Sequence, residues 1–65
     1  MDNIGQKIKE KRLQKKLTQK QLAEKLSKTD RTRLNRIENG KLVATVNELL
    51  EIAAALKISP KSLVG

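Results

Sequence analysis

Five polar side chains between positions 30 and 40 are of the types that hydrogen-bond to the edges of nucleic-acid bases. On a helical wheel they fall on one side: Arg31, Thr32, Asn35, Arg36 and Asn39. Arginine pairs with guanine, asparagine pairs with adenine, and the methyl group of threonine contacts the methyl group of thymine. An ordinary solvated helix face carries the same residue types, so the meaning of this pattern depends on the elements that surround it.

The same segment carries the signals of a short helix that would present this polar face. Asp30 is a good N-cap, because its carboxylate accepts hydrogen bonds from free backbone N–H groups. Gly40 stands where a left-handed C-terminal cap belongs. Leu34 and Ile37, three positions apart, form an apolar stripe opposite the polar face. The pattern predicts a helix over about residues 30–39.

A second short helix is predicted just before the first. Thr18 and Gln21 form a capping-box pattern, and the helix runs to Leu26 or Ser27. Its apolar side consists of Leu22, Ala23 and Leu26. The connection Ser27–Thr29 is then a three-residue turn. Two short helices joined by such a turn have helix-turn-helix geometry, in which the second helix is free to enter a DNA major groove.

Three further helices and no strand are expected in the rest of the chain. A helix from about Asn3 to Lys15 would bury its aliphatic positions, Ile4, Ile8 and Leu13, and would begin with a capping box of Asn3 and Gln6. A helix over Val46–Leu56, capped by Thr45 and Glu48, has the widest apolar face and is expected to be the centre of the core. The residues of that face are Val46, Leu49, Leu50, Ile52, Ala53 and Leu56. Ser59 and Pro60 begin a short last helix that carries Leu63 and Val64 onto the core.

Composition narrows the possible functions. The chain has 65 residues and a net charge of +8, and eleven of its 15 basic residues lie in residues 1–33. Such an asymmetry favours a polyanionic partner, although a solubilising lysine-rich surface would carry the same excess of basic residues.

With no Cys and no His, a zinc site is excluded. The seven carboxylates show no sign of converging in a pocket and there is no Gly-rich phosphate loop, so neither an enzyme nor a cofactor is expected. The absence of aromatic residues argues against single-strand binding by base stacking. No apolar run is long enough to span a membrane, and we expect a cytoplasmic protein of one domain over 1–65.

The chain resembles the Cro and phage-repressor (Xre-type) helix-turn-helix family over nearly its whole length. The resemblance is carried by three segments: Thr18–Leu26, Leu34–Lys41, and Leu49–Leu56 with Ile58, Ser59 and Leu63 after it. It implies an all-α fold, a compact five-helix bundle of the lambda-repressor-like type. It also implies a homodimer that binds a pseudo-palindromic operator in double-stranded DNA.

The resemblance assigns roles to residues by position. The base-reading positions are Arg31, Thr32, Asn35 and Arg36, and the positions that contact the DNA backbone are Gln19, Asn39 and Lys41. Gln19 also matches a residue that braces the recognition helix. Arg12 and Glu38 match a buried salt bridge, for which an architectural role is expected because a buried charge needs a partner. Arg33 flanks the core on the wheel, and we expect it to reach a DNA phosphate or to be solvated.

Two features depart from the family pattern. The turn before the predicted recognition helix is one residue longer than usual, and Thr29 stands where a small apolar residue is common. The recognition helix could therefore be shifted relative to the helix before it. In the loop near position 43, Leu42 and Val43 either join a dimer contact or are buried under the helix that follows.

The sequence thus predicts a sequence-specific DNA-binding transcriptional regulator, more specifically a repressor, that inserts the helix over about 30–39 in the major groove. One alternative is an antitoxin or bridging protein of the same fold that binds a protein partner. The other is a non-specific nucleic-acid binder driven by its lysines, which would show no operator preference and would lose all binding near 200 mM salt.

Overall fold

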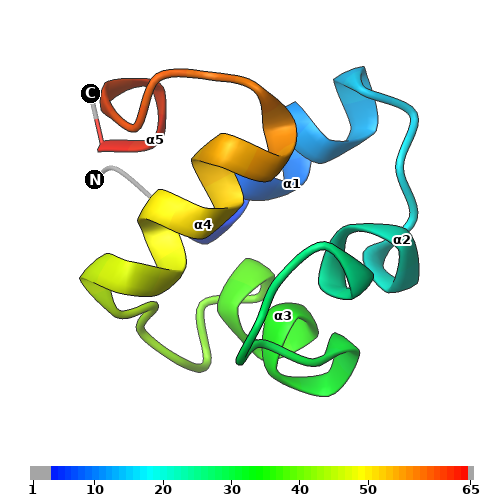
Figure 1. Ribbon diagram of the computed structural model, residues 1–65. Helices are drawn as coiled ribbons and strands as arrows, with labels where there is room; N and C mark the ends of the chain where they lie inside the picture. Colours follow the sequence, from blue (N-terminus) through cyan, green and yellow to red (C-terminus); the bar gives the residue numbers. More distant parts are fainter. Residues whose placement is uncertain (1–3, 65) are drawn as a thin grey trace.

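The computed structural model describes residues 4–64, and in this part of the chain helices are the only regular secondary structure. Five helices follow one another: α1 (Ile4–Gln14), α2 (Gln19–Glu24), α3 (Arg31–Glu38), α4 (Val46–Leu56) and α5 (Lys61–Val64). Figure 1 shows α4 crossing in front of α1, with α2 and α3 on one side of that pair and α5 on the other. The predicted all-α helix-turn-helix bundle is confirmed.

Each of the five helices contributes at least one fully buried aliphatic side chain to a shared core. These side chains are Ile8, Leu22, Leu34, Ile52, Leu56 and Leu63. Burying such a side chain contributes roughly 1.5–3 kcal/mol to folding. Because α3 supplies Leu34 and the nearly buried Ile37 to this core, its opposite face is turned to solvent.

The predicted helix ends are confirmed where they depend on local capping. Thr18 and Thr45 both close complete capping boxes, with Gln21 and Glu48 as their partners. Asp30 caps α3 by accepting a 2.8 Å hydrogen bond from the backbone N–H of Arg33. The capping box expected of Asn3 lies outside the described residues.

The C-terminal end of α3 is a Schellman motif, as the glycine after it predicted. Gly40 has a φ of 74°. Its N–H donates to the carbonyl of Ile37 (3.1 Å), and the N–H of Lys41 donates to the carbonyl of Arg36 (2.9 Å). These bonds satisfy carbonyls that would otherwise lack partners. They also fix the direction in which the chain leaves α3 toward Lys41.

Gly5 has a packing role that its helix propensity does not show. A Cβ atom built on Gly5 would lie 2.0 Å from the carbonyl oxygen of Ile37. Since the obstructing atom belongs to the backbone, no side-chain movement could relieve the clash. The glycine therefore lets α1 approach the last turn of α3 directly.

Several predicted core positions are exposed. In α4, Val46 is 72% exposed and Leu50 is 49% exposed, because α4 packs with its other side. That other side is formed by Glu48, Ile52, Ala53 and Leu56. Leu13 and Val64 are also exposed rather than buried. For α4 the reason is geometric: the bundle covers one stripe of each helix, so a helix that is apolar over most of its circumference leaves aliphatic side chains in solvent.

Helix α2 is shorter than predicted, and the connection after it is longer. The sequence pattern places the end of the helix near Leu26, whereas α2 ends at Glu24 and residues 25–30 connect it to α3. The N–H of Leu26 donates to the carbonyl of Ala23, three residues back, which tightens the last turn. No helix within residues 4–64 has the length and apolar character needed to cross a membrane.

Candidate nucleic-acid interface

The polar face predicted for residues 30–39 is present on α3. All four expected base-reading residues lie on the exposed side of the helix: Arg31, Thr32, Asn35 and Arg36. Leu34 and Ile37 hold the opposite side in the core, with 0% and 2% of their surfaces exposed. Within residues 4–64 no hydrogen bond or ion pair engages the side chains of Arg31, Thr32 or Arg36, so these groups are available to an external ligand. Lys41, just after the helix, is exposed as well.

Arg12 and Glu38 form a buried ion pair that joins α1 to the last residue of α3. Arg12 Nε donates to Glu38 Oε2 at 2.8 Å, and Arg12 Nη2 donates to Glu38 Oε1 at 3.2 Å. The third guanidinium nitrogen, Nη1, donates to the carbonyl of Leu17 at 2.7 Å. The paired geometry satisfies the buried charges, which otherwise would be costly to desolvate.

Gln19 extends this pair into a chain of amide hydrogen bonds along the exposed side of α3. Its Nε2 atom donates to Glu38 Oε1 at 3.0 Å, and its Oε1 atom accepts from Asn35 Nδ2 at 3.2 Å. Asn39 Nδ2 in turn donates to Asn35 Oδ1 at 3.2 Å. Gln19, the first residue of α2, therefore braces α3, and it also gives the amide of Asn35 a defined orientation.

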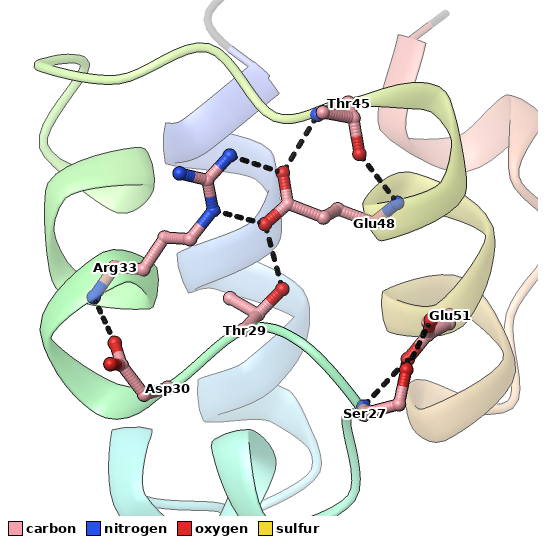
Figure 2. A network of polar contacts seen from close by, with 7 residues as sticks. All are labelled: Ser27, Thr29, Asp30, Arg33, Thr45, Glu48 and Glu51. Atoms are coloured by element: carbon pink, nitrogen blue, oxygen red, sulfur yellow. Dashed lines mark hydrogen bonds and ion pairs between the residues drawn. The ribbon is translucent and has the colours of Figure 1, made fainter.

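Arg33 has a partner in the structure that the sequence pattern does not predict. Its Nε and Nη2 atoms both donate to the carboxylate of Glu48 in α4, the second at 2.9 Å (Figure 2). The hydrogen bond from Arg33 is the main cause that lowers the pKa of Glu48 to about 2, and hydrogen bonds from Thr45 and Thr29 act in the same direction. The pKa of Arg33 is raised by the same pairing. The sequence predicts that this guanidinium contacts a DNA phosphate or solvent, whereas in the structure it contacts the carboxylate of Glu48.

The turn before α3 is tied to α4 as well. Thr29 is buried, with 4% of its surface exposed, and its hydroxyl donates to Glu48 Oε2 at 2.7 Å. One turn further along α4, Glu51 accepts from the backbone N–H of Ser27 at 2.8 Å and from its hydroxyl (Figure 2). The bond from the Ser27 backbone is the largest cause that lowers the pKa of Glu51.

These contacts of Glu48 and Glu51 are the part of the site that sequence reasoning missed. Glu48 was recognised only for its capping box with Thr45, which it does form. The available signal was Thr29, a polar residue at a position that is commonly apolar. A buried hydroxyl needs a hydrogen-bond partner, and a carboxylate on a facing helix can supply one.

Leu42 and Val43, predicted either to join a dimer contact or to be buried under the following helix, differ in their burial. Leu42 is half-buried and packs against the core, whereas Val43 is 86% exposed. Val43 lies in the loop before α4, and Val46 and Leu50 are exposed aliphatic residues in the first two turns of α4. We call these three residues the α4 aliphatic patch.

The comparisons with known proteins agree with this geometry. A family model described as helix-turn-helix matches residues 8–63, which include all five helices in whole or in part. Neither a curated protein nor a solved structure matches the chain significantly. The matched span, the five-helix bundle and the exposed polar face of α3 place the chain in the Xre-type helix-turn-helix family of DNA-binding regulators.

Proposed function

We propose that this protein is a sequence-specific regulator of transcription that inserts α3 into the major groove of double-stranded DNA. The observation that carries the proposal is the exposed face of α3, where Arg31, Thr32 and Arg36 have no partner among residues 4–64. These side chains, with Asn35, supply the donors, acceptors and methyl group that distinguish base pairs in a major groove.

Contacts to the DNA backbone are proposed for the residues at the edges of this face. Gln19 lies at the N-terminal end of α2, where free backbone N–H groups favour an anion. Asn39 lies at the C-terminal end of α3, and Lys41 follows two residues later. Arg33, for which the sequence predicts either a phosphate contact or solvation, is engaged by Glu48, and we assign its main role to that ion pair.

Electrostatics supports the same partner. The chain carries a net charge of +8, and most of its basic residues precede position 34. Binding to a duplex would release counterions from the phosphates that these residues neutralise, so the affinity would fall steeply with salt. A sequence-dependent part of the affinity should persist above that background.

The proposed form on DNA is a homodimer acting as a cytoplasmic repressor. A dimer would place two copies of α3 in successive major grooves, with half-sites about 10 bp apart, and occupancy of a promoter would block transcription. The α4 aliphatic patch supports a protein contact: Val46 and Leu50, four positions apart, share one exposed face of α4, Val43 is exposed in the loop before it, and exposed aliphatic surface marks such contacts.

A selection from random duplexes, followed by footprinting, tests this proposal. We expect a pseudo-palindromic consensus, and each mismatch in it should reduce the binding free energy by about 1–3 kcal/mol. Recovery of duplexes without any consensus, with all binding lost near 200 mM salt, would instead support a lysine-driven non-specific binder.

The α4 aliphatic patch also favours a second candidate function, that of an antitoxin or bridging protein. Val43 is the most exposed of its three residues, and a different protein could cover them as well as a second copy of this chain. Sedimentation of the purified protein separates the two cases. A monomer both alone and on its selected DNA would favour a heterologous partner, and a dimer on DNA would favour the repressor.

A further inference from the structure

Two carboxylates of α4 hold the segment that leads into α3. Glu48 and Glu51, three positions apart, both point from α4 toward the connection between α2 and α3 (Figure 2). Glu51 binds Ser27 near the start of that connection, and Glu48 binds Thr29 near its end. Glu48 also binds Arg33 in the first turn of α3. A single face of α4 therefore contacts three successive parts of the helix-turn-helix.

This arrangement replaces the apolar anchor that such a turn would otherwise need. The six residues from 25 to 30 contain one aliphatic side chain, Leu26, and it is only half-buried. Thr29 is buried, and a buried hydroxyl stabilises its position only while it is hydrogen-bonded. The backbone of α3 lies closest to α1 and α2, so α4 acts on the start of α3 through the side chain of Glu48.

The carboxylate of Glu48 is used to its full capacity. Oε1 accepts from the backbone N–H of Thr45 and from Arg33 Nη2, and Oε2 accepts from Thr29 Oγ1 and Arg33 Nε. An ionised carboxylate offers about four acceptor sites, and all are occupied by donors. A glutamine at this position would turn an NH₂ group toward two of those donors, so it cannot reproduce the arrangement.

We infer that Glu48, assisted by Glu51, is a positioning residue for DNA recognition: it fixes the turn before α3 and keeps the guanidinium of Arg33 away from the base-reading face. This inference rests on the proposed function. Without Glu48, the first turn of α3, with Arg31 and Thr32, would lose a fixed orientation. At the same time Arg33 would become a mobile cation beside that face, able to contact any phosphate.

Glu48→Gln is the principal test, and the readout is the ratio of affinities for the selected duplex and for a scrambled duplex. We expect this ratio to fall about tenfold or more, the loss of roughly one correctly read base pair, while affinity for the scrambled duplex stays the same or rises. If Glu48 only stabilised the fold, Glu48→Gln would leave a fraction of the protein unfolded. Both affinities would then fall by the same factor, and their ratio would stay unchanged. Glu24→Gln, at an exposed carboxylate of α2, makes the same change in net charge and should also leave the ratio unchanged.

Arg33→Lys is a second variant that keeps the net charge and serves if Glu48→Gln does not fold. Lysine retains a cation for a phosphate but cannot donate two parallel hydrogen bonds to a carboxylate. We expect the affinity ratio to fall several-fold if Arg33 acts through Glu48. An unchanged ratio in this variant, or in folded Glu48→Gln, would overturn the inference.

A measurement without DNA separates failure of the inference from failure of the proposed function. In ¹H–¹⁵N NMR spectra, Glu48→Gln should shift the backbone amides of residues 27–36, while in ¹H–¹³C spectra the methyl signals of Ile8, in the core on α1, stay in place. If the wild-type protein had no sequence preference, the proposed function would fail, yet these shifts would still report on positioning. Amides 27–36 that remain unmoved would contradict the inference whatever the protein binds.

Discussion

Glu38, the last residue of α3, is held by Arg12 of α1, 26 positions earlier in the chain, through a buried ion pair with 2.8 Å between Nε and Oε2. The same carboxylate accepts a hydrogen bond from Gln19, so three helices meet at one side chain. This junction fixes the C-terminal end of α3, while Glu48 of α4 holds its N-terminal end. The candidate recognition helix is thus anchored by a carboxylate near each of its ends.

Removal of one partner from the buried pair should be more harmful than removal of both. Arg12→Met leaves the charge of Glu38 buried without a partner, and we expect the free energy of unfolding to fall by about 3–5 kcal/mol. Arg12→Met combined with Glu38→Met removes the uncompensated charge and should recover much of that loss. Urea denaturation measures both values. A double variant no more stable than Arg12→Met would show that the pair itself supplies most of the stability.

The division between base-reading and backbone residues predicts two distinct binding defects. Arg36→Ala should relax the preference at one position of the selected site, at a cost of about 1–3 kcal/mol for that base pair. Lys41→Ala should weaken binding to all sequences alike and reduce the slope of log affinity against log salt by about 1. Titration of a panel of single-mismatch duplexes at several salt concentrations measures both effects. If the two variants behave alike, the roles are wrongly divided.

The pairing of Glu48 predicts how stability depends on pH. Its pKa is lowered from an ordinary value of 4.5 to about 2, so its contribution is fully present above pH 4.5 and is lost as the pH falls toward 2. We expect this loss to be about 1–2 kcal/mol, since solvent around the partly exposed Arg33 screens the pair. Chemical denaturation between pH 5 and pH 2 should show a shallower decline for Glu48→Gln than for the wild-type protein. If the free energy of unfolding fell equally in the two proteins, other carboxylates would be the cause of the acid sensitivity.

Two lysines occupy backbone positions that favour glycine, and replacing them should stabilise the protein. Lys16 and Lys57 have φ values of 59° and 57°, just after α1 and α4. Left-handed backbone strains a residue with a Cβ atom, whereas glycine adopts it freely but loses more entropy on folding. We expect Lys16→Gly and Lys57→Gly each to raise the free energy of unfolding by about 0.5–1 kcal/mol.

The control for these glycine variants is a lysine in regular helix. Lys9 is exposed in the middle of α1, and Lys9→Gly removes the same charge. Its effect should have the opposite sign, a destabilisation of about 1 kcal/mol, because glycine is a poor helix former. Destabilisation by all three variants would show that the left-handed positions carry no strain.

The α4 aliphatic patch predicts a defect in assembly without a defect in folding. Val46 is 72% exposed, so Val46→Ser should change the free energy of unfolding little, by within about 0.5 kcal/mol. It should weaken binding to a full pseudo-palindromic site while binding to a single half-site stays the same. Leu13→Ser, at an exposed aliphatic residue of α1, is the matched control and should leave both unchanged. Equal effects of the two variants would remove the patch from the proposed dimer contact.

Features that depend on neighbours in the chain could be predicted from the sequence. The caps at Thr18, Asp30 and Thr45 and the left-handed turn at Gly40 each involve residues within three or four positions. The same locality holds for the spacing of Leu34 and Ile37, which determined the exposed face of α3 because helical periodicity relates position to direction. The predicted helices and the polar face of α3 followed from such patterns, whereas the five-helix bundle and the base-reading assignment followed from the resemblance to the Xre-type family.

The amino-acid order therefore determined which helices form, where their caps lie and which face of α3 is polar. Only the tertiary structure decided that Val46 and Leu50 are exposed, that Arg33 pairs with Glu48, and that the buried hydroxyl of Thr29 has a carboxylate to which it donates a hydrogen bond. The physical reason is that these outcomes depend on the relative placement of helices 15 or more positions apart. Because α4 is apolar over most of its circumference, its own periodicity does not specify which of its sides will meet the rest of the bundle.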